Sequence, residues 1–405
     1  MRIRIVFYPI FFTLFFFIGL PTASAEVAPS NVRQAFESAW LRSSAQQVRT
    51  ARQDEIAAEQ EAARSWLAGA PVVGMAQRSD RWTDNRGERE TEVSVATPVW
   101  LPGQISTRRE AARLGTDRFD TEIALARLTL AGEVRERLWA VALARDMLAE
   151  AEQHHHHLDM LAQDVKRRVG AGDLARTDNL LAIQEVLKAA SGIHLARSKL
   201  EEANTRYTAL TGLSEVISPE PEVLENLPIE QHPKLLMAKK SLERAQAAGR
   251  VTASNRSDPP TIGISMRREQ EREGSGFSRS LNLAVQIPIG TATRNRPLDA
   301  AAYTGIQTAS VELMQINVAL QAEIDIAGQQ LRTAQLANTN AAAQAALLSE
   351  HTALMEKAFR LGEGSLPELY RAQTSLHEAT AAVRQQHNAV GLASARLNQA
   401  MGALP

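Results

Sequence analysis

Four consecutive histidines, His154 to His157, form the densest group of metal-ligating side chains in the sequence. Imidazole nitrogens suit zinc, copper and nickel, so the tetrad is a candidate transition-metal site. Successive side chains on a helix fan out by about 100°, and only His154 and His157 therefore come near one face. The chain contains no cysteine, and no acid completes a preformed site. A solvated or packed helical segment is the favoured interpretation, with His154 and His157 kept as metal candidates.

No other group of residues has the composition of a catalytic site. The lack of cysteine excludes a disulfide framework, a thiolate metal site, a thiol nucleophile and a lipid-anchored amino terminus. We therefore expect neither an enzyme nor a cofactor. The remaining histidines stand singly in helical stretches and are expected to add surface polarity: His194, His232, His351, His377 and His387.

The first 25 residues read as a secretory signal. Arg2 and Arg4 precede an apolar stretch from Ile5 to Leu20, and the sequence PTASA follows. Small residues at Ala23 and Ala25 predict cleavage after Ala25. A permanent membrane anchor is the alternative, but the stretch is shorter than the ~20 residues of a spanning helix.

The mature chain has a balanced charge. Without the two leader arginines, 43 basic residues stand against 46 acidic ones, which gives no indication of nucleic-acid binding. No later stretch is a ~20-residue apolar run. An exported chain of this kind is periplasmic, secreted, or a β-barrel protein whose individual strands are weak signals.

The chain contains an internal duplication with a period of about 190 residues. The segment Val95 to Ala112 matches Ala284 to Ala301, and Arg167 to Leu174 matches Phe359 to Leu366. In the second match Gly170 and Gly172 correspond to Gly362 and Gly364. We therefore expect a signal peptide at 1–25, a first structural repeat at 26–213, a linker at 214–231 and a second repeat at 232–405.

Each repeat is expected to have the same order of elements: a helix of medium length, two strands, a very long helix, a Gly-x-Gly turn and a return helix. The expected helices cover 31–67, 104–169 and 173–211 in the first repeat, and 232–253, 295–361 and 365–401 in the second. The expected strands cover 71–77, 91–100, 260–267 and 280–289.

The long helices carry a coiled-coil pattern. Apolar residues recur at three- and four-residue steps between Val134 and Val165, which predicts a narrow helical seam. A helix of roughly 65 residues is about 100 Å long, far beyond the diameter of a globular core. Glycine suits the end of such a helix, and Asp173 and Ser365 are expected to cap the return helices.

The strands alternate between apolar and small or polar residues, as membrane strands do. In the second repeat Ile262, Ile264 and Met266 share one face. Four strands cannot close a barrel, and open edges cannot sit in lipid. We therefore predict a mostly α fold with a small membrane β part, in which three chains form a 12-stranded barrel continued by a hollow α-helical coiled-coil tube.

The chain resembles the TolC family of outer-membrane efflux proteins, and most closely its CzcC-like branch of heavy-metal efflux. The residues that carry the resemblance are RVGAGDLARTDNLLAIQ (168–184), LGEGSLPELYRAQ (361–373), HPKLLMAKKSLERAQAAG (232–249) and PIGTATRNRPLDAA (288–301). The resemblance implies a homotrimeric exit duct in outer-membrane lipid with a periplasmic helical extension. An inner-membrane pump of the RND type would supply the energy.

The resemblance also implies that a periplasmic adaptor protein docks on the two hairpin tips. Turn geometry alone is the other explanation for the glycines there. Acids near the tips would form rings in a trimer and select cations at a constriction; the alternative is that Asp173 only caps a helix and the other acids face water. The implied docking residues are Arg168, Gly170, Gly172, Asp173, Leu174, Arg360, Gly362, Gly364, Ser365 and Leu366. The candidate lumen acids are Asp178, Glu363 and Glu368.

Two other functions stay open at this point. The duct could carry drugs, other small molecules or a secreted polypeptide, because a duct contacts its cargo only in passing. A soluble periplasmic coiled-coil scaffold is the other alternative, and it predicts no membrane strands.

Overall fold

A computed structural model describes residues 31–216 and 218–405 of the 405-residue chain. The expected signal peptide lies outside the described residues. The first set of elements is α1 (Asn31–Arg42), α2 (Ser44–Arg64), β1 (Val72–Ser79), β2 (Arg89–Pro98), α3 (Gln104–Ala171) and α4 (Arg176–Thr211). A 3-10 turn, η1 (Ile229–Gln231), then leads into α5 (Pro233–Ser254), β3 (Thr261–Gln270), β4 (Ser278–Gln286), α6 (Ala292–Leu361) and α7 (Leu366–Ala400).

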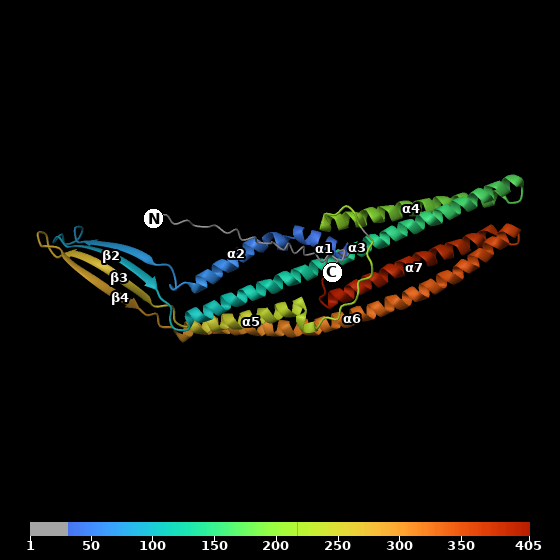
Figure 1. The fold of residues 1–405 in the computed structure, drawn as a ribbon. Helices are drawn as coiled ribbons and strands as arrows, with labels where there is room; N and C mark the ends of the chain where they lie inside the picture. The colour runs from blue at the N-terminus through green and yellow to red at the C-terminus, as the bar shows by residue number, and fades with distance from the viewer. Residues whose placement is uncertain (1–30, 217) are drawn as a thin grey trace, which may run out of the picture.

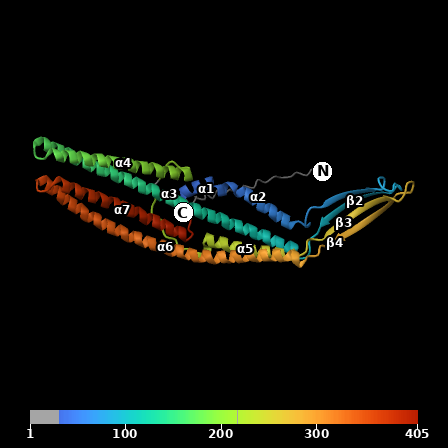
Figure 2. The same ribbon diagram turned by 180° about the vertical axis from the view of Figure 1, so that it is seen from behind.

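The described chain is long and narrow. The sheet lies at one end and the two helical hairpins, α3–α4 and α6–α7, reach the other (Figure 1). The four hairpin helices lie side by side in the order α4, α3, α7, α6, and the view from behind shows the same order (Figure 2). Nearer the sheet, α2 and α5 take the places beside α3 that α4 and α7 hold toward the tips. The mostly helical fold with one four-stranded sheet confirms the predicted fold class.

The order of elements from α1 to α4 recurs from α5 to α7, with one difference. The expected single helix at 31–67 is wrong, because the chain breaks at Ser43 into α1 and α2. The Ser43 hydroxyl donates to the Trp40 carbonyl at 2.8 Å and accepts from the Gln46 amide at 3.2 Å. A serine that bonds to nearby backbone competes with the helix in this way. The division of the chain into repeats at residues 213 and 232 stays a prediction.

The middle of the helical part is held by an apolar core. Ala131, Val134, Leu138 and Val141 follow one another at three- and four-residue steps on α3, and all are buried. They pack with Phe36 of α1. This spacing places the four side chains on one helix face, so the seam that the sequence predicts is confirmed here.

The four strands form one antiparallel sheet in the order β1-β2-β3-β4. Apolar side chains align across all four strands in two rows on one face, and every one of them is exposed, from 47% to 76%. We call this set the apolar rows. One row is Val73, Val95, Ile264 and Leu283, and the other is Met75, Val93, Met266 and Leu281.

The segment between α4 and α5 is fastened to the helices by a buried ion pair. The Arg135 side chain on α3 is 2% exposed and donates to both oxygens of Glu222, at 2.8 and 2.7 Å. It also donates to the Gln399 side chain at 2.8 Å and to the Ala403 carbonyl at 3.0 Å. Asn398 donates to Glu222 at 3.1 Å. One guanidinium therefore ties α3, the linker and the carboxyl terminus together.

No helix among the described residues is long and apolar enough to cross a lipid bilayer.

Candidate functional site: the hairpin tips and the helical wall

The first tip joins α3 to α4 through a left-handed glycine. Gly172 has φ 89°, and the Asp173 amide donates back to the Arg168 carbonyl at 2.9 Å. This is the glycine-terminated helix end that leaves few carbonyls unpaired. The return helix is capped at Ala175, whose amide donates to the Asp178 carboxylate at 3.1 Å. Asp173 was expected as the N-cap. That prediction is wrong, because the N-cap is Ala175, two residues further along the chain.

The second tip repeats this geometry. Gly362 has φ 80°, and the Glu363 amide donates to the Ala358 carbonyl at 3.0 Å. Ser365 is the N-cap of α7, as predicted, and Glu368 accepts from its amide at 3.3 Å and from its hydroxyl at 2.8 Å. These hydrogen bonds lower the pKa of Glu368. The two tips are therefore built on the same backbone pattern.

The structural match between the tips differs from the sequence match. The left-handed residues are Gly172 and Gly362, and neither Gly170 nor Gly364 has a positive φ. The expected pairing of Gly170 with Gly362 and of Gly172 with Gly364 is thus shifted by two residues. Only the position with a left-handed backbone favours glycine. The structurally equivalent glycines are therefore the two that share this conformation, Gly172 and Gly362.

The expected tip residues differ in their exposure. Gly170, Gly172, Asp173, Arg360, Gly362, Glu363 and Ser365 are exposed around the turns. Leu366 is only 3% exposed and Leu174 packs against the same apolar cluster. Both leucines therefore support the tips from inside. Asp178 and Glu368 each accept a hydrogen bond at the start of a return helix, a role that the sequence reasoning gave to Asp173 alone.

Arg168 connects the two hairpins. Its guanidinium donates to the Phe359 carbonyl of α6 at 3.3 Å and lies 5.1 Å from the centre of the Phe359 ring. Asp164, one turn back on α3, pairs with it at 2.9 Å. The buried Phe359, Leu366 and Val165 belong to one cluster, so residues of both hairpins share the apolar core near the tips.

The histidine tetrad lies midway along the hairpins, where α3 meets α7. The His154 ring stacks on the His377 ring with centroids 3.9 Å apart and an angle of 11°. Nδ1 of His377 lies 3.2 Å from the buried Glu150 carboxylate, to which Thr380 and Arg384 also donate, at 2.7 and 2.9 Å. These bonds, that of His377 foremost, lower the pKa of Glu150 to about 2. Burial, with the neighbouring His377, lowers the pKa of His154 to about 4.

His154 and His157 line the same cavity, whose volume is about 540 Å³. His377, Glu356 and Gln373 reach it from α6 and α7. Within the described residues, no three His, Asp or Glu side chains are already placed to hold one metal ion together. The expected tetrad geometry, with His154 and His157 on one side of the helix, agrees with this placement.

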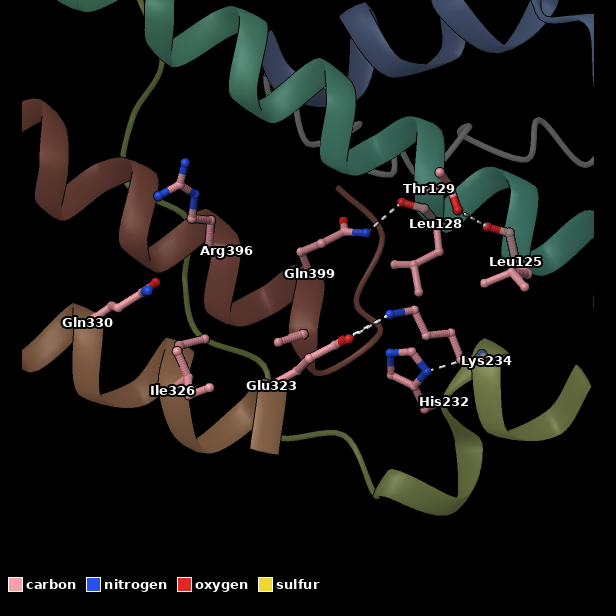
Figure 3. Close-up of a pocket in the computed structure, with 12 residues that line it drawn as sticks. Leu125, Leu128, Thr129, His232, Lys234, Glu323, Ile326, Gln330, Arg396 and Gln399 are labelled. Carbon is pink, nitrogen blue, oxygen red and sulfur yellow. Dashed lines mark hydrogen bonds and ion pairs between the residues drawn. The ribbon is translucent and has the colours of Figure 1, made fainter. Parts of the chain in front are cut away.

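A smaller cavity of about 280 Å³ lies where α7 ends and α5 begins (Figure 3). His232, which is 3% exposed, accepts from the Lys234 amide through Nδ1 at 3.1 Å. Lys234 pairs with Glu323 of α6 at 2.8 Å, so both charges at the mouth are compensated. Burial lowers the pKa of His232. Surface polarity was expected for His232 and His377, and for both the expectation is wrong.

Sequence reasoning missed the buried polar groups. Glu150 and Arg135 of α3 and Asn388 of α7 are buried among the long helices, which together we call the helical wall. Each is a common residue in a polar helical stretch. Glu150 precedes His154 by four residues and therefore lies on the same face of the helix. This spacing is the only sequence signal that could have predicted their proximity.

Two solved structures share this architecture over nearly the whole chain. The crystal structure of CusC superposes with a TM-score of 0.76 at 16% identity, covering 92% of each chain. The outer-membrane protein VceC of Vibrio cholerae gives a TM-score of 0.74 at 14% identity, covering 92% of this chain and 96% of that one. The chain therefore shares the fold of CusC and VceC, which confirms the fold that the resemblance implies.

Among curated proteins, the chain is similar to the cobalt-zinc-cadmium resistance protein CzcC of Cupriavidus metallidurans. The two are 24% identical over 260 residues, which is 61% of this chain and 61% of CzcC. The matched part thus spans less than two thirds of that relative. No family model matches the chain.

Proposed function

We propose that three copies of this chain form an outer-membrane exit duct of a tripartite RND-type efflux system. The observation that carries the proposal is the pair of apolar rows. Eight apolar side chains lie on one face of the sheet at 47% to 76% exposure. Water penalises such a surface, whereas the hydrocarbon of a bilayer accepts it.

The opposite face of the sheet suits a channel interior. Gly74, Ser94, Gly263, Ser265 and Asn282 alternate with the apolar rows along the strands. Small and polar residues on this side are what a water-filled lumen requires. An α-helical scaffold in water would gain nothing from this two-sided pattern.

The free edges of the sheet call for further copies of the chain. β1 and β4 each pair on one side only, and an open edge cannot face lipid. Three copies placed edge to edge give twelve strands, an even number within the range of outer-membrane barrels.

The outer helices carry matching seams. On α6, Leu347, Leu354 and Leu361 are spaced by seven residues and are at least 60% exposed. On α4, Leu180, Ile183 and Leu187 form a comparable exposed stripe. Since α4 and α6 are the two outermost helices of the hairpins, each stripe is free to pack on the next copy as a coiled-coil seam.

The hairpin tips lie at the end far from the sheet (Figure 1). In the proposed duct they point into the periplasm, and their exposed turns are the surface that an adaptor protein meets. Asp173 and Glu363 occupy the same position in the two tips. Three chains then present six similar turns, each with one exposed acid at this position.

Heavy-metal cations are the proposed cargo, by similarity to CzcC. The outer-membrane channels CmeC of Campylobacter jejuni and MtrE of Neisseria gonorrhoeae have the same fold, so the fold alone does not name a cargo. Organic cargo is the competing proposal. A gene-deletion strain separates the two. We expect it to lose resistance to at least one of zinc, cobalt, cadmium, nickel and copper, and to recover with the intact gene. Loss of resistance to organic compounds alone would reject the metal cargo.

The duct itself is tested on purified protein. Extraction of the mature chain should require detergent, and the extracted protein should migrate as a trimer that separates on heating. A fully soluble monomer would reject the duct and favour a periplasmic scaffold.

A further inference from the structure

We propose that Arg89, Arg268 and Arg279 bind the phosphate of an anionic lipid headgroup, at the border of the apolar rows that lies farthest from the helices. We call these three residues the arginine patch. The proposal rests on the duct, because it needs the apolar rows to face lipid. It adds a specific lipid contact, which a duct does not by itself require.

The arginine patch continues the apolar rows along the same face of the sheet. Arg268 and Arg279 lie directly opposite each other on β3 and β4, one row beyond the apolar rows. Arg89 of β2 lies one row further on, opposite Gln270 of β3. Side chains on one face of a strand recur at every second residue, so all three guanidiniums stand on the face of the apolar rows. This end of the sheet is the one remote from the helices (Figure 1).

Charge of the opposite sign is confined to the other face. Glu90, Glu92 and Glu269 are the only acids within the four strands. Each directly follows or precedes a residue of the apolar face in its strand, so all three point the other way. Glu90 and Glu92 pair there with Arg267, at 2.9 and 3.2 Å. Along the strands, the face of the apolar rows therefore carries three positive charges and no negative one.

The three guanidiniums lack a carboxylate partner in the chain. Arg89, Arg268 and Arg279 are exposed, and within residues 31–216 and 218–405 none of them takes part in an ion pair. Arg268 lies over the Phe277 ring instead, 3.8 Å from its centre. An aromatic ring at this border is typical of a membrane strand at the headgroup level. The patch thus offers its N–H donors to an anion from outside the chain.

The pairing of two arginines across the strands also favours a bound anion. Residues directly opposite each other in an antiparallel pair have β-carbons about 4.5–5.5 Å apart, and like charges placed so are destabilising. A phosphate between Arg268 and Arg279 removes that cost. The planar guanidinium fork matches two oxygens of one phosphate, and arginine side chains at the edge of a bilayer extend toward the headgroups.

The neighbouring surface favours a lipid over a soluble anion. Met266 and Leu281 directly adjoin the patch, and they are 53% and 76% exposed. A lipid lays its acyl chains along the apolar rows and places its phosphate at the arginines, so both surfaces are covered by one molecule. A soluble anion would use the arginines alone.

The test titrates two lipids with identical acyl chains into the detergent-solubilised mature chain. Dioleoyl phosphatidic acid has a free phosphate, whereas choline masks the phosphate of dioleoyl phosphatidylcholine. Native mass spectrometry counts the bound lipids and reports the oligomeric state in the same spectra. We expect the unchanged protein to bind phosphatidic acid about tenfold more tightly than phosphatidylcholine. R268Q/R279Q should abolish this preference.

The matched control is Arg78→Gln. Arg78 is also exposed, but it lies opposite Glu90 and therefore on the other face of the sheet. Arg279→Gln should lower the preference for phosphatidic acid about threefold, while Arg78→Gln should leave it unchanged. Each preference is a ratio measured within one variant, so partial loss of folded protein does not imitate the effect.

Three results would overturn the patch: equal affinity of the unchanged protein for the two lipids, equal losses from Arg279→Gln and Arg78→Gln, or displacement of phosphatidic acid by an equal concentration of inorganic phosphate. The second would mean that overall charge attracts the lipid, and the third that the ligand is a soluble anion. Trimers without a lipid preference would reject the patch alone. Monomers that need no detergent would reject the duct, and with it the lipid-facing orientation of the sheet.

Discussion

Removing Glu222 should strongly destabilise the junction between the hairpins and the linker. Glu222→Ala leaves the Arg135 guanidinium buried, with only the Gln399 side chain and the Ala403 carbonyl as acceptors. The variant loses the two hydrogen bonds of 2.7 and 2.8 Å from the guanidinium, and with them the Asn398 hydrogen bond to the same carboxylate. Hydrogen bonds to charged groups contribute about 1.5–3 kcal/mol each, and breaking a buried ion pair costs about 3–5 kcal/mol. We expect a loss of about 3–5 kcal/mol.

The chain supplies a matched control in the pair Arg396–Glu136. This pair joins α7 to α3, likewise by two hydrogen bonds, at 2.6 and 3.0 Å, but its side chains are 50% and 45% exposed. Exposed pairs contribute about 0–1 kcal/mol. Glu136→Ala should therefore have little effect, although the two pairs look alike in geometry.

The assay is urea unfolding of the detergent-solubilised protein, followed by circular dichroism, with limited proteolysis of the linker as a second readout. A loss of 3–5 kcal/mol changes the folded-to-unfolded ratio by roughly a hundred- to several-thousandfold. The linker around residue 222 should be cleaved faster in Glu222→Ala only. The double variant R135M/E222A should recover part of the loss, because no charge is left buried. Equal effects of Glu222→Ala and Glu136→Ala would refute the reasoning.

Three further predictions concern single positions. Gly172→Ala should lower stability by about 1–2 kcal/mol because its φ is 89°, whereas Gly170→Ala should be neutral or stabilising in urea unfolding. Gly391→Ala should cost about 1–3 kcal/mol, since a Cβ there would overlap the buried Trp139 ring; a Trp139→Phe background should reduce that cost in the same assay. Burial lowers the pKa of His232, so its contribution to stability should be lost as pH falls through about 6.5. In thermal unfolding between pH 7 and pH 5, His232→Asn, which keeps an acceptor for the helix amide but does not titrate there, should flatten the decline.

The helices and strands could be predicted from the sequence because each depends on a local periodicity. Heptad steps on the long helices and alternation on the strands both reflect the geometry of one element, and the observed bounds differ from the expected ones by a few residues. The break at Ser43 was missed because a serine in a helix-forming stretch looks ordinary until its hydroxyl is seen to bond to the backbone. The shift between the tips was missed because both Gly-x-Gly pairs contain the same letters, and only φ separates Gly172 from Gly170.

The buried polar residues around Gln399 follow a different rule, which depends on where helices end. The first amides and the last carbonyls of a helix have no partner within it, and this fold has such ends where α7 stops and α5 begins. His232, Arg135 and Gln399 gather there and bond to backbone atoms or to one another. The hydrogen-bonded partners are up to 271 residues apart in the sequence, so no local sequence pattern predicts these contacts. A long bundle in which shorter helices lie end to end needs specific polar residues at each junction, and these junctions are where substitution should be least tolerated.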